Sequence, residues 1–182
     1  MSNHVAGVLL HITSLPSQYP SGSLGDSAHQ FLNWMSDCGL KLWQTLPLHP
    51  INGALSPYSS TSAFAGAPHL IDVKILAEQG WLTTEEIANP PTQNWVSNET
   101  IQEWLLPRIF TAAERFAKAH PKRIRSFIKS EDWVEDWAHF QCLIKEFDVY
   151  AWQDFPASLR DRNTTALSKS KKAHKKDIHT HI

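Results

Sequence analysis

Two short apolar runs near the start of the chain are separated by a segment with helical periodicity. Residues 5–12 are almost all apolar, and a second apolar run covers residues 40–48. Between them, apolar side chains recur at steps of three and four from Ala28 to Cys38, and Gly39 fits the left-handed end of a helix. Strand, helix and strand thus follow one another within about 40 residues, the size of a right-handed βαβ unit. The unbroken apolar runs predict parallel strands that are buried on both faces.

The segments that leave these strands are rich in small polar residues. Residues 13–25 contain many Ser, Pro and Gly residues, and the loop that continues to residue 67 contains hydroxyl residues, a tyrosine and two glycines. Because α/β folds build their sites at the carboxyl ends of strands, we expect the binding site here. His11 and His49 stand at the two strand ends, where each either contacts a ligand or is a buried structural histidine.

The composition of the chain changes near residue 71. Only three residues before this point are acidic or basic, and the remaining residues carry nearly all of the charge. We therefore predict the start of an α/β fold at residues 1–72, a more solvated, mainly helical insertion at residues 73–162 and a polar, lysine-rich end at residues 163–182.

Apolar periodicity predicts two longer helices within the second part. Residues 99–119 have helical spacing that is interrupted by Pro107, where we expect a kink or a break. A clearer apolar stripe runs over residues 130–147 and predicts a helix with one buried and one acidic face. Upstream of both, Thr83 and Glu86 have the spacing of a capping box, which predicts the start of a short helix.

The last 20 residues or so have no clear periodicity. His179 and His181 alternate in a way that suits a strand more than a helix, but a polar tail is the preferred interpretation. The lysines of this segment lack interleaved aromatic residues and follow acidic helices, so a solvated end is favoured over a site for nucleic acid.

Composition narrows the class of protein further. A formal net charge of -1 gives no general attraction to nucleic acid or to anionic lipid, so neither is an expected partner. The two cysteines lie within apolar helical patterns, which is typical of reduced, buried thiols. The first residues lack a basic segment and a long apolar run, so we expect neither a signal peptide nor a membrane span, and we place the protein in the cytoplasm.

The candidate chemistry is that of binding rather than catalysis. A retaining glycosidase or transglycosylase needs two carboxylates about 5 Å apart, and the available acidic residues, Asp132, Glu135 and Asp136, lie on the solvated face of a predicted helix. The histidines are scattered without the spacing of a metal site, and the serines lack a GxSxG elbow. The 8 tryptophans admit a carbohydrate ligand, because indole rings stack on the apolar faces of sugars, although most tryptophans are packing residues.

Several short motifs occur in a fixed order along nearly the whole chain. They are Gly7-Val-Leu-Leu-His-Ile-Thr-Ser-Leu-Pro16, Gly25, Leu42-Trp-Gln-Thr-Leu-Pro-Leu48, Ser56-Pro-Tyr-Ser-Ser60, Ser62-Ala-Phe-Ala-Gly66 and Trp152-Gln-Asp-Phe-Pro156 with Leu159-Arg160. In this order and spacing they resemble the N-terminal region of the amylomaltases, which are the 4-alpha-glucanotransferases, or disproportionating enzymes, of glycoside hydrolase family 77.

The resemblance implies a fold, a reaction and a set of ligand contacts. It implies an α/β fold that is part of a (β/α)8 TIM barrel, with the first two strands and the first helix followed by a mainly helical insertion. The family transfers α-1,4-glucan segments between maltooligosaccharides by a retaining mechanism, without a metal or another cofactor. The family's Ser-Pro-Tyr motif lines the donor sugar site, which carries over to Ser56 and Tyr58, and we add His11 and Trp43 as candidate glucan contacts.

The sequence departs from the family pattern at a few positions and in length. Leu55 stands where an acidic residue often precedes Ser-Pro-Tyr, and His69 ends a motif that usually ends in tyrosine. The family's catalytic carboxylates lie in later strands, and a closed barrel needs about 250 residues, so we expect the 182-residue chain alone to be inactive. We also expect it to be poorly stable, because two strands leave open edges and apolar faces. Two alternatives stay open: a non-catalytic glucan-binding or regulatory remnant, and a truncated, non-functional gene product.

Overall fold

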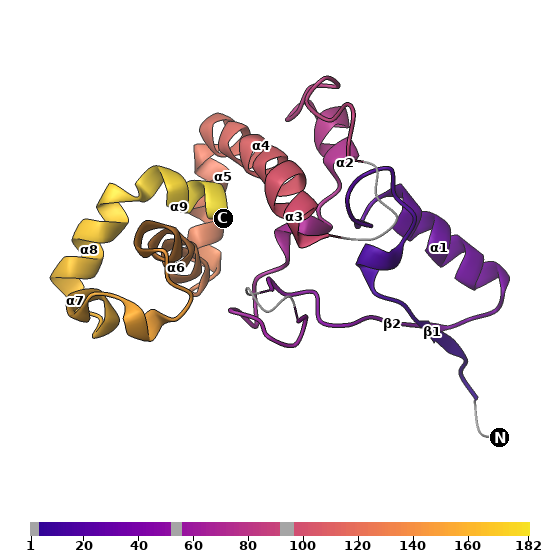
Figure 1. The fold of residues 1–182 in the computed structure, drawn as a ribbon, viewed down its shortest axis with the longest axis horizontal. Helices are drawn as coiled ribbons and strands as arrows, with labels where there is room; N and C mark the ends of the chain where they lie inside the picture. The colour runs from indigo at the N-terminus through magenta and orange to yellow at the C-terminus, as the bar shows by residue number, and fades with distance from the viewer. Residues whose placement is uncertain (1–3, 52–55, 92–96) are drawn as a thin grey trace. The chain divides into compact units, whose positions relative to one another are not determined.

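The computed structural model of the protein describes residues 4–51, 56–91 and 97–182. The chain divides into two compact units, Met1–Ala112 and Ala113–Ile182, and each is a body with its own secondary structure (Figure 1). The domain limits predicted at residues 72 and 162 stay predictions. The departure noted at Leu55 lies outside the described residues.

The predicted succession of strand, helix and strand opens the first unit. Strand β1 (Gly7–Leu9) is followed by α1 (Asp26–Asp37) and β2 (Leu42–Gln44), and the two strands pair in parallel with Val8 opposite Trp43 (Figure 1). Each strand is three residues long and is therefore shorter than the apolar run, 5–12 or 40–48, that predicts it. Beyond β1, the side chain of His11 accepts a hydrogen bond from the backbone N–H of Thr13 and starts a 3-10 turn, η1 (Ile12–Ser14), which ends the extended backbone.

The prediction that both strands are buried on both faces is wrong for the described part of the chain. Val5, Leu9 and Leu42 are 61%, 59% and 55% exposed. The pairing itself is close, since a Cβ atom on Gly7 would collide with the carbonyl oxygen of Leu42, so glycine permits this approach of the two strands. The apolar runs are therefore compatible with a sheet that has further layers, but the described residues cover only part of these faces.

The described residues of the first unit form two apolar clusters. One lies between the end of β1 and α1 and contains Ile12, Leu15, Ala28, Ala67 and Leu70. The other surrounds α2 (Val73–Glu78) and the helical segment that starts with α3 (Asn98–Thr100), and its buried residues are Val73, Leu82, Ile101, Trp104, Leu105, Ile109 and Ala112. A 3-10 turn, η2 (Pro68–Leu70), joins the first cluster to α2.

The helix predicted over residues 99–119 forms with an irregular start. A π-helical segment, η3 (Ile101–Leu105), ends two residues before Pro107, and a regular helix, α4 (Leu106–Ala119), which contains the proline, continues from it. Proline has no backbone N–H to donate to the preceding turn, so the irregularity predicted at Pro107 is present just upstream of it. The capping box of Thr83 and Glu86 is confirmed by reciprocal hydrogen bonds of 2.8 and 3.2 Å, but residues 84–87 form turns instead of the predicted helix.

The second unit is helical in the part that the structure describes. After the end of α4 it contains α5 (Pro121–Ser130), α6 (Val134–Phe147), the 3-10 turn η4 (Trp152–Asp154), α7 (Ala157–Arg160), α8 (Thr164–Ala173) and α9 (Lys175–His181) (Figure 1). The predicted amphipathic helix at 130–147 therefore starts later, at Val134. Its buried face packs against α9, where Ala138 and Cys142 contact Ile178.

The last residues of the chain contradict two predictions. Residues 164–173 and 175–181 form helices and not an irregular tail, and His179 and His181 lie in a helix and not in a strand. Four lysines of these helices are nevertheless exposed to solvent as predicted: Lys169, Lys172, Lys175 and Lys176. Helical geometry places Ile178 and Ile182, four residues apart, on one face, and both pack on the Ala138 cluster. Some of the lysines form ion pairs: Lys171 pairs with Glu135 at 2.8 Å and Lys176 with Glu114 at 2.7 Å.

The two cysteines differ in exposure. Cys142 is buried as predicted, whereas Cys38 is exposed at the end of α1, so the prediction of two buried thiols is wrong for Cys38. Over the described residues, no helix combines the length and the apolar character that crossing a membrane requires.

Candidate functional site

Trp43, the middle residue of β2, is a structural anchor. Its indole N–H donates to the carbonyl oxygen of Leu10 at 2.8 Å, and its ring meets the edge of Phe31 with 4.8 Å between the ring centroids. The half-buried ring thus ties β2 to the chain that leaves β1 and to α1. The predicted contact between Trp43 and a glucan stays a prediction.

His11 presents an unsatisfied hydrogen-bonding atom at the end of β1. Its Nδ1 atom lies 2.8 Å from Thr13 Oγ1 and accepts the Thr13 backbone N–H at 3.4 Å. With Nδ1 as an acceptor, the neutral ring carries its proton on Nε2. Nε2 is buried and has no hydrogen-bond partner in the part of the chain that the structure describes. A buried donor without a partner costs about 1–3 kcal/mol, so a ligand oxygen that accepts from this atom would be favoured.

His69 is a second buried histidine of this region. It lies in η2, is 7% exposed, and stands where the related motif ends in tyrosine. Burial and, as the smaller cause, the nearby charge of His11 together lower the pKa of His69 to about 4. The ring is therefore neutral at pH 7 and offers one donor and one acceptor nitrogen. In the sequence His69 is recognisable only as a departure from the family motif, and it lies 58 positions from His11, so no local pattern predicts that the two histidines are close.

The serines of the loop after β2 are used mainly to shape the loop. Ser60 Oγ donates to the carbonyl oxygens of Pro50 and Ser62, at 2.9 and 2.7 Å. Ser62 Oγ accepts the backbone N–H groups of Phe64 and Ala65 at 3.2 and 3.0 Å. His49 also takes a structural role, since its Nδ1 atom lies 3.3 Å from the carbonyl oxygen of Ala65.

Ser56 and Tyr58 lie at the exposed side of this loop. The Tyr58 backbone N–H donates to Ser56 Oγ at 3.3 Å, which holds the two residues of the motif together. The side chain of Tyr58 is 75% exposed, so both its ring face and its hydroxyl are accessible to a ligand. Ser56 and Tyr58 are thus joined by a hydrogen bond, and His11 lies close enough to His69 to lower its pKa. No contact between the described residues joins these two pairs.

The carboxylates of the first unit near these loops are engaged in structure. Asp72 caps α2 by accepting the Lys74 backbone N–H at 2.8 Å, and it also accepts from Ser23 Oγ at 2.7 Å. Asp26 pairs with the ammonium group of Lys74. Neither carboxylate is free to act as a nucleophile beside the histidines.

The acidic residues of α6 are likewise paired. Glu135 and Asp136 both accept from Lys171, at 2.8 and 2.7 Å, and Asp136 also accepts from Arg162. Burial opposes ionisation of Asp136, but the hydrogen bonds from Lys171 and Arg162 outweigh it and lower the pKa of this carboxyl. Such a group stays ionised at neutral pH and is a poor general acid.

No metal centre is visible among the described residues: His, Cys, Asp and Glu side chains do not gather there in groups of three or more. The expectation that no metal or other cofactor is needed stays a prediction. The first unit thus offers histidine and hydroxyl groups that donate and accept hydrogen bonds and, separately, an exposed aromatic ring, and both suit a neutral ligand with many hydroxyl groups.

Comparisons with known proteins agree on one family. A family model described as 4-alpha-glucanotransferase matches residues 10–182. The chain is 37% identical over 180 residues to the 4-alpha-glucanotransferase of Thermus thermophilus, which covers 96% of this chain and 36% of that protein. It is 36% identical to the chloroplastic/amyloplastic 4-alpha-glucanotransferase of Solanum tuberosum, over 89% of this chain and 30% of that protein.

A solved structure of an amylomaltase is also similar to the chain. The amylomaltase from Streptococcus agalactiae in complex with acarbose superposes with a TM-score of 0.85 at 28% identity, over 97% of this chain and 37% of that one. The chain thus spans about a third of the length of the relatives it matches.

Proposed function

The chain belongs to the 4-alpha-glucanotransferase family, glycoside hydrolase family 77, and from this we propose that it forms one wall of the donor-sugar site of such a transferase. The proposed reaction is the transfer of α-1,4-glucan segments between maltooligosaccharides by a retaining mechanism. In this role the chain contributes the first two strands and the first helix of a (β/α)8 barrel, together with a mainly helical insertion. A cytoplasmic location goes with this proposal as a prediction.

The observation that carries the assignment to a sugar site is the unpartnered, buried Nε2–H of His11. A sugar hydroxyl is neutral, so it can accept from this atom without placing a charge in the buried site. His69, whose pKa is lowered in part by the charge of His11, is also neutral at pH 7. The exposed ring of Tyr58 supplies a face for the apolar side of a pyranose, and Ser56 fixes the backbone of Tyr58.

The proposal separates binding from catalysis. Retaining transfer requires two carboxyl groups about 5–5.5 Å apart, one as the nucleophile and one as the acid/base. The carboxylates discussed above act as helix caps or ion-pair partners in the described residues, so none is assigned a catalytic role. We therefore expect the 182-residue chain alone to bind maltooligosaccharides without transferring them.

The test is an assay for transfer followed by one for binding. Purified chain is incubated with maltotriose, and glucose and longer maltooligosaccharides are sought against a boiled control. We expect no products. Glucose and maltotetraose formed only by the unboiled chain would contradict the division between binding and catalysis and would require a catalytic carboxylate within these residues.

Binding is then measured by calorimetric titration with maltotriose. Tyr58→Ala is expected to weaken binding at this site roughly tenfold, because the stacking surface is lost. Tyr150→Ala is the matched control, since Tyr150 is 72% exposed and lies in the other unit. Equal isotherms for the parent chain and Tyr58→Ala would refute the donor-site assignment.

A non-catalytic glucan-binding remnant would also bind maltotriose, so the binding assay does not distinguish it from a portion of a transferase. The unfolding of the purified chain does distinguish them. The apolar clusters of the first unit favour the remnant, since they give Met1–Ala112 a core of its own. A single cooperative unfolding transition together with maltotriose binding would support the remnant. Weak, non-cooperative unfolding without binding would support a truncated, non-functional product.

A further inference from the structure

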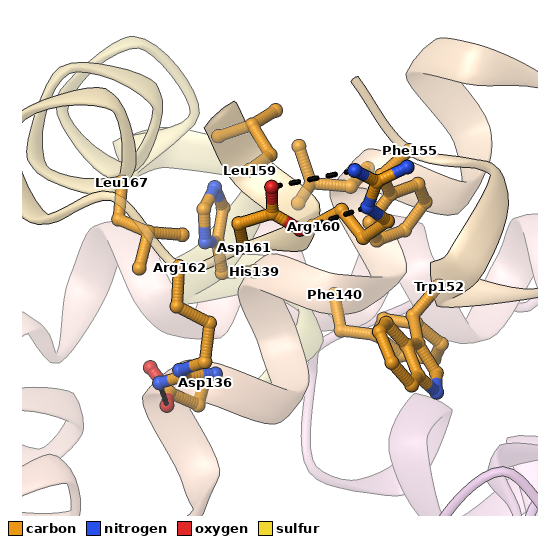
Figure 2. Close-up of a pocket in the computed structure, with 11 residues that line it drawn as sticks. Asp136, His139, Phe140, Trp152, Phe155, Leu159, Arg160, Asp161, Arg162 and Leu167 are labelled. Carbon is orange, nitrogen blue, oxygen red and sulfur yellow. Dashed lines mark hydrogen bonds and ion pairs between the residues drawn. The ribbon is translucent and has the colours of Figure 1, made fainter. Parts of the chain in front are cut away.

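A cavity of about 470 Å³ lies within the second unit, apart from the residues assigned above. Its walls come from α6, from η4 and α7, and from α8 (Figure 2). A volume of this size is within the range of pockets that hold small ligands. Two of the lining residues, Trp152 and Arg160, belong to the Trp152–Pro156 and Leu159–Arg160 motifs, for which the proposed donor site gives no role.

The floor of the cavity is apolar and aromatic. Phe140 and Phe155 lie with 5.8 Å between their ring centroids, and Phe155 and Leu143 are buried. Trp152 differs from these residues because it is 54% exposed although it lines the cavity. An indole that lines a cavity and still meets solvent is available to stack on a ligand.

The polar groups around this floor form two balanced ion pairs. Arg160 donates to Asp161 through Nε and Nη2, at 2.8 and 3.3 Å, and Arg162 Nη2 donates to Asp136 at 2.7 Å. Figure 2 shows the two pairs and the Trp152 indole as three separate groups around the cavity. Arg162 has a left-handed backbone, with φ of 56°, at the turn that brings its side chain to α6.

The balance of charge decides the class of ligand. The two guanidinium groups are matched by Asp161 and Asp136. The ammonium group of Lys171, which also pairs with Asp136, is matched by Glu135. Burial lowers the pKa of His139, which also lines the cavity. An anion would have to compete with Asp136 and Asp161 for the arginines, and a cation would have to compete with the arginines for the carboxylates. A neutral ligand with many hydroxyls does neither, since each guanidinium keeps spare N–H donors and each exposed carboxylate keeps spare acceptor sites.

From this arrangement we propose that the cavity is a second carbohydrate site, in which a linear α-1,4-glucan stacks a glucose ring on Trp152 and hydrogen-bonds to the Arg160–Asp161 and Arg162–Asp136 pairs. The site carries no reacting group and holds a glucan instead of cleaving it. The choice of an α-1,4-glucan among neutral sugars rests on the proposed function. The aromatic floor and the balanced ion pairs around it are observed in the structure and do not depend on the proposed function.

The experiment titrates maltotriose into the full 182-residue chain and its variants by calorimetry. In a Tyr58→Ala background, which weakens the donor site, the residual binding reports the cavity. Adding Trp152→Ala is expected to weaken that residual binding roughly tenfold, and Trp152→Phe is expected to restore most of it. Trp34→Ala is the matched control, because Trp34 is 50% exposed and lies on α1 of the first unit.

The outcomes separate the two sites. Residual binding that Trp152→Ala does not change would overturn the second site and leave the donor site intact. Loss of binding with Trp152→Ala alone, and no effect of Tyr58→Ala, would support the cavity and refute the donor-site assignment. Inorganic phosphate that displaces maltotriose would overturn the neutral-ligand argument. If Trp152→Ala fails to fold by circular dichroism, Asp161→Asn gives the same test, since it frees Arg160 and is expected to weaken binding severalfold.

Discussion

Buried His69 predicts that part of the chain's stability depends on pH. Its pKa is lowered to about 4, mainly by burial, from the value of 6.5 that applies in the unfolded chain. The unfolded state therefore binds a proton between about pH 6.5 and pH 4 that the folded state does not. The contribution of His69 to stability is fully present above pH 6.5 and is lost as the pH falls to about 4.

The size of the effect follows from the two pKa values. Full protonation of His69 costs the folded state about 3 kcal/mol relative to the unfolded state. Between pH 7 and pH 4.5 the expected loss is about 2 kcal/mol, because part of the titration lies below pH 4.5. His69→Gln keeps a polar side chain that does not titrate, so it should remove this loss without leaving a large cavity.

The assay is urea unfolding followed by tryptophan fluorescence, at pH 7 and at pH 4.5, for the parent chain and for His69→Gln. Other groups whose pKa is lowered, such as His139 and Asp136, also destabilise the fold in acid, but they are present in both proteins and cancel in the difference. His29→Gln makes the same exchange on the exposed surface of α1 and controls for the exchange itself. If the parent and His69→Gln lose the same free energy of unfolding over this interval, the reasoning from burial is refuted.

Three further predictions concern packing, capping and thiol reactivity. Asp72→Ala removes the cap of α2 and is expected to lower the free energy of unfolding by about 1–2 kcal/mol in urea; an unchanged midpoint would contradict the capping role. Ala138→Leu overfills a fully buried position and should cost about 1–3 kcal/mol, whereas Ala157→Leu on exposed α7 should change the midpoint little. In the folded chain Cys38 should react with a thiol reagent at pH 8, whereas Cys142 should react only after unfolding, because burial raises the pKa of its thiol to about 11; two fast equivalents would be the contrary result.

The fold could be predicted where local pattern and tertiary structure agree. The parallel pairing of β1 and β2 across α1 follows from two apolar runs at the distance of a βαβ unit. The Thr83–Glu86 capping box forms as predicted because its two hydrogen bonds are local. The helix expected to follow it does not form, since a cap satisfies backbone N–H groups but does not supply the packing that propagates a helix.

The C-terminal helices show what local pattern misses. The alternation of His179 and His181 is compatible with a strand when these two residues are considered alone. The spacing of Ile178 and Ile182 does not decide the matter, because residues four apart share a face in a strand as well as in a helix. The deciding contact is the packing of Ile178 on the face formed by Ala138 and Cys142 of α6. That face exists only once α6 has folded, so the information lies about 40 positions away from the segment that it orders.

In the candidate site, too, some features depend on residues that are close in the sequence and others on residues that are far apart. Ser56 and Tyr58 are recognisable as a motif, and the hydrogen bond between them is local, so sequence was enough to find them. His69 matters through its burial and through the charge of His11, and both depend on how the loops after β1 and β2 fold back onto the Ile12 cluster. Because burial and the charge of His11 both oppose a proton on His69, protonating His69 in acid should disturb the packing beside His11, and binding of a ligand that accepts from His11 Nε2 should weaken as His69 becomes charged. Loss of maltotriose affinity between pH 7 and pH 4.5 that His69→Gln abolishes would tie the buried histidine to the sugar site; the same loss in both proteins would assign the effect to other groups.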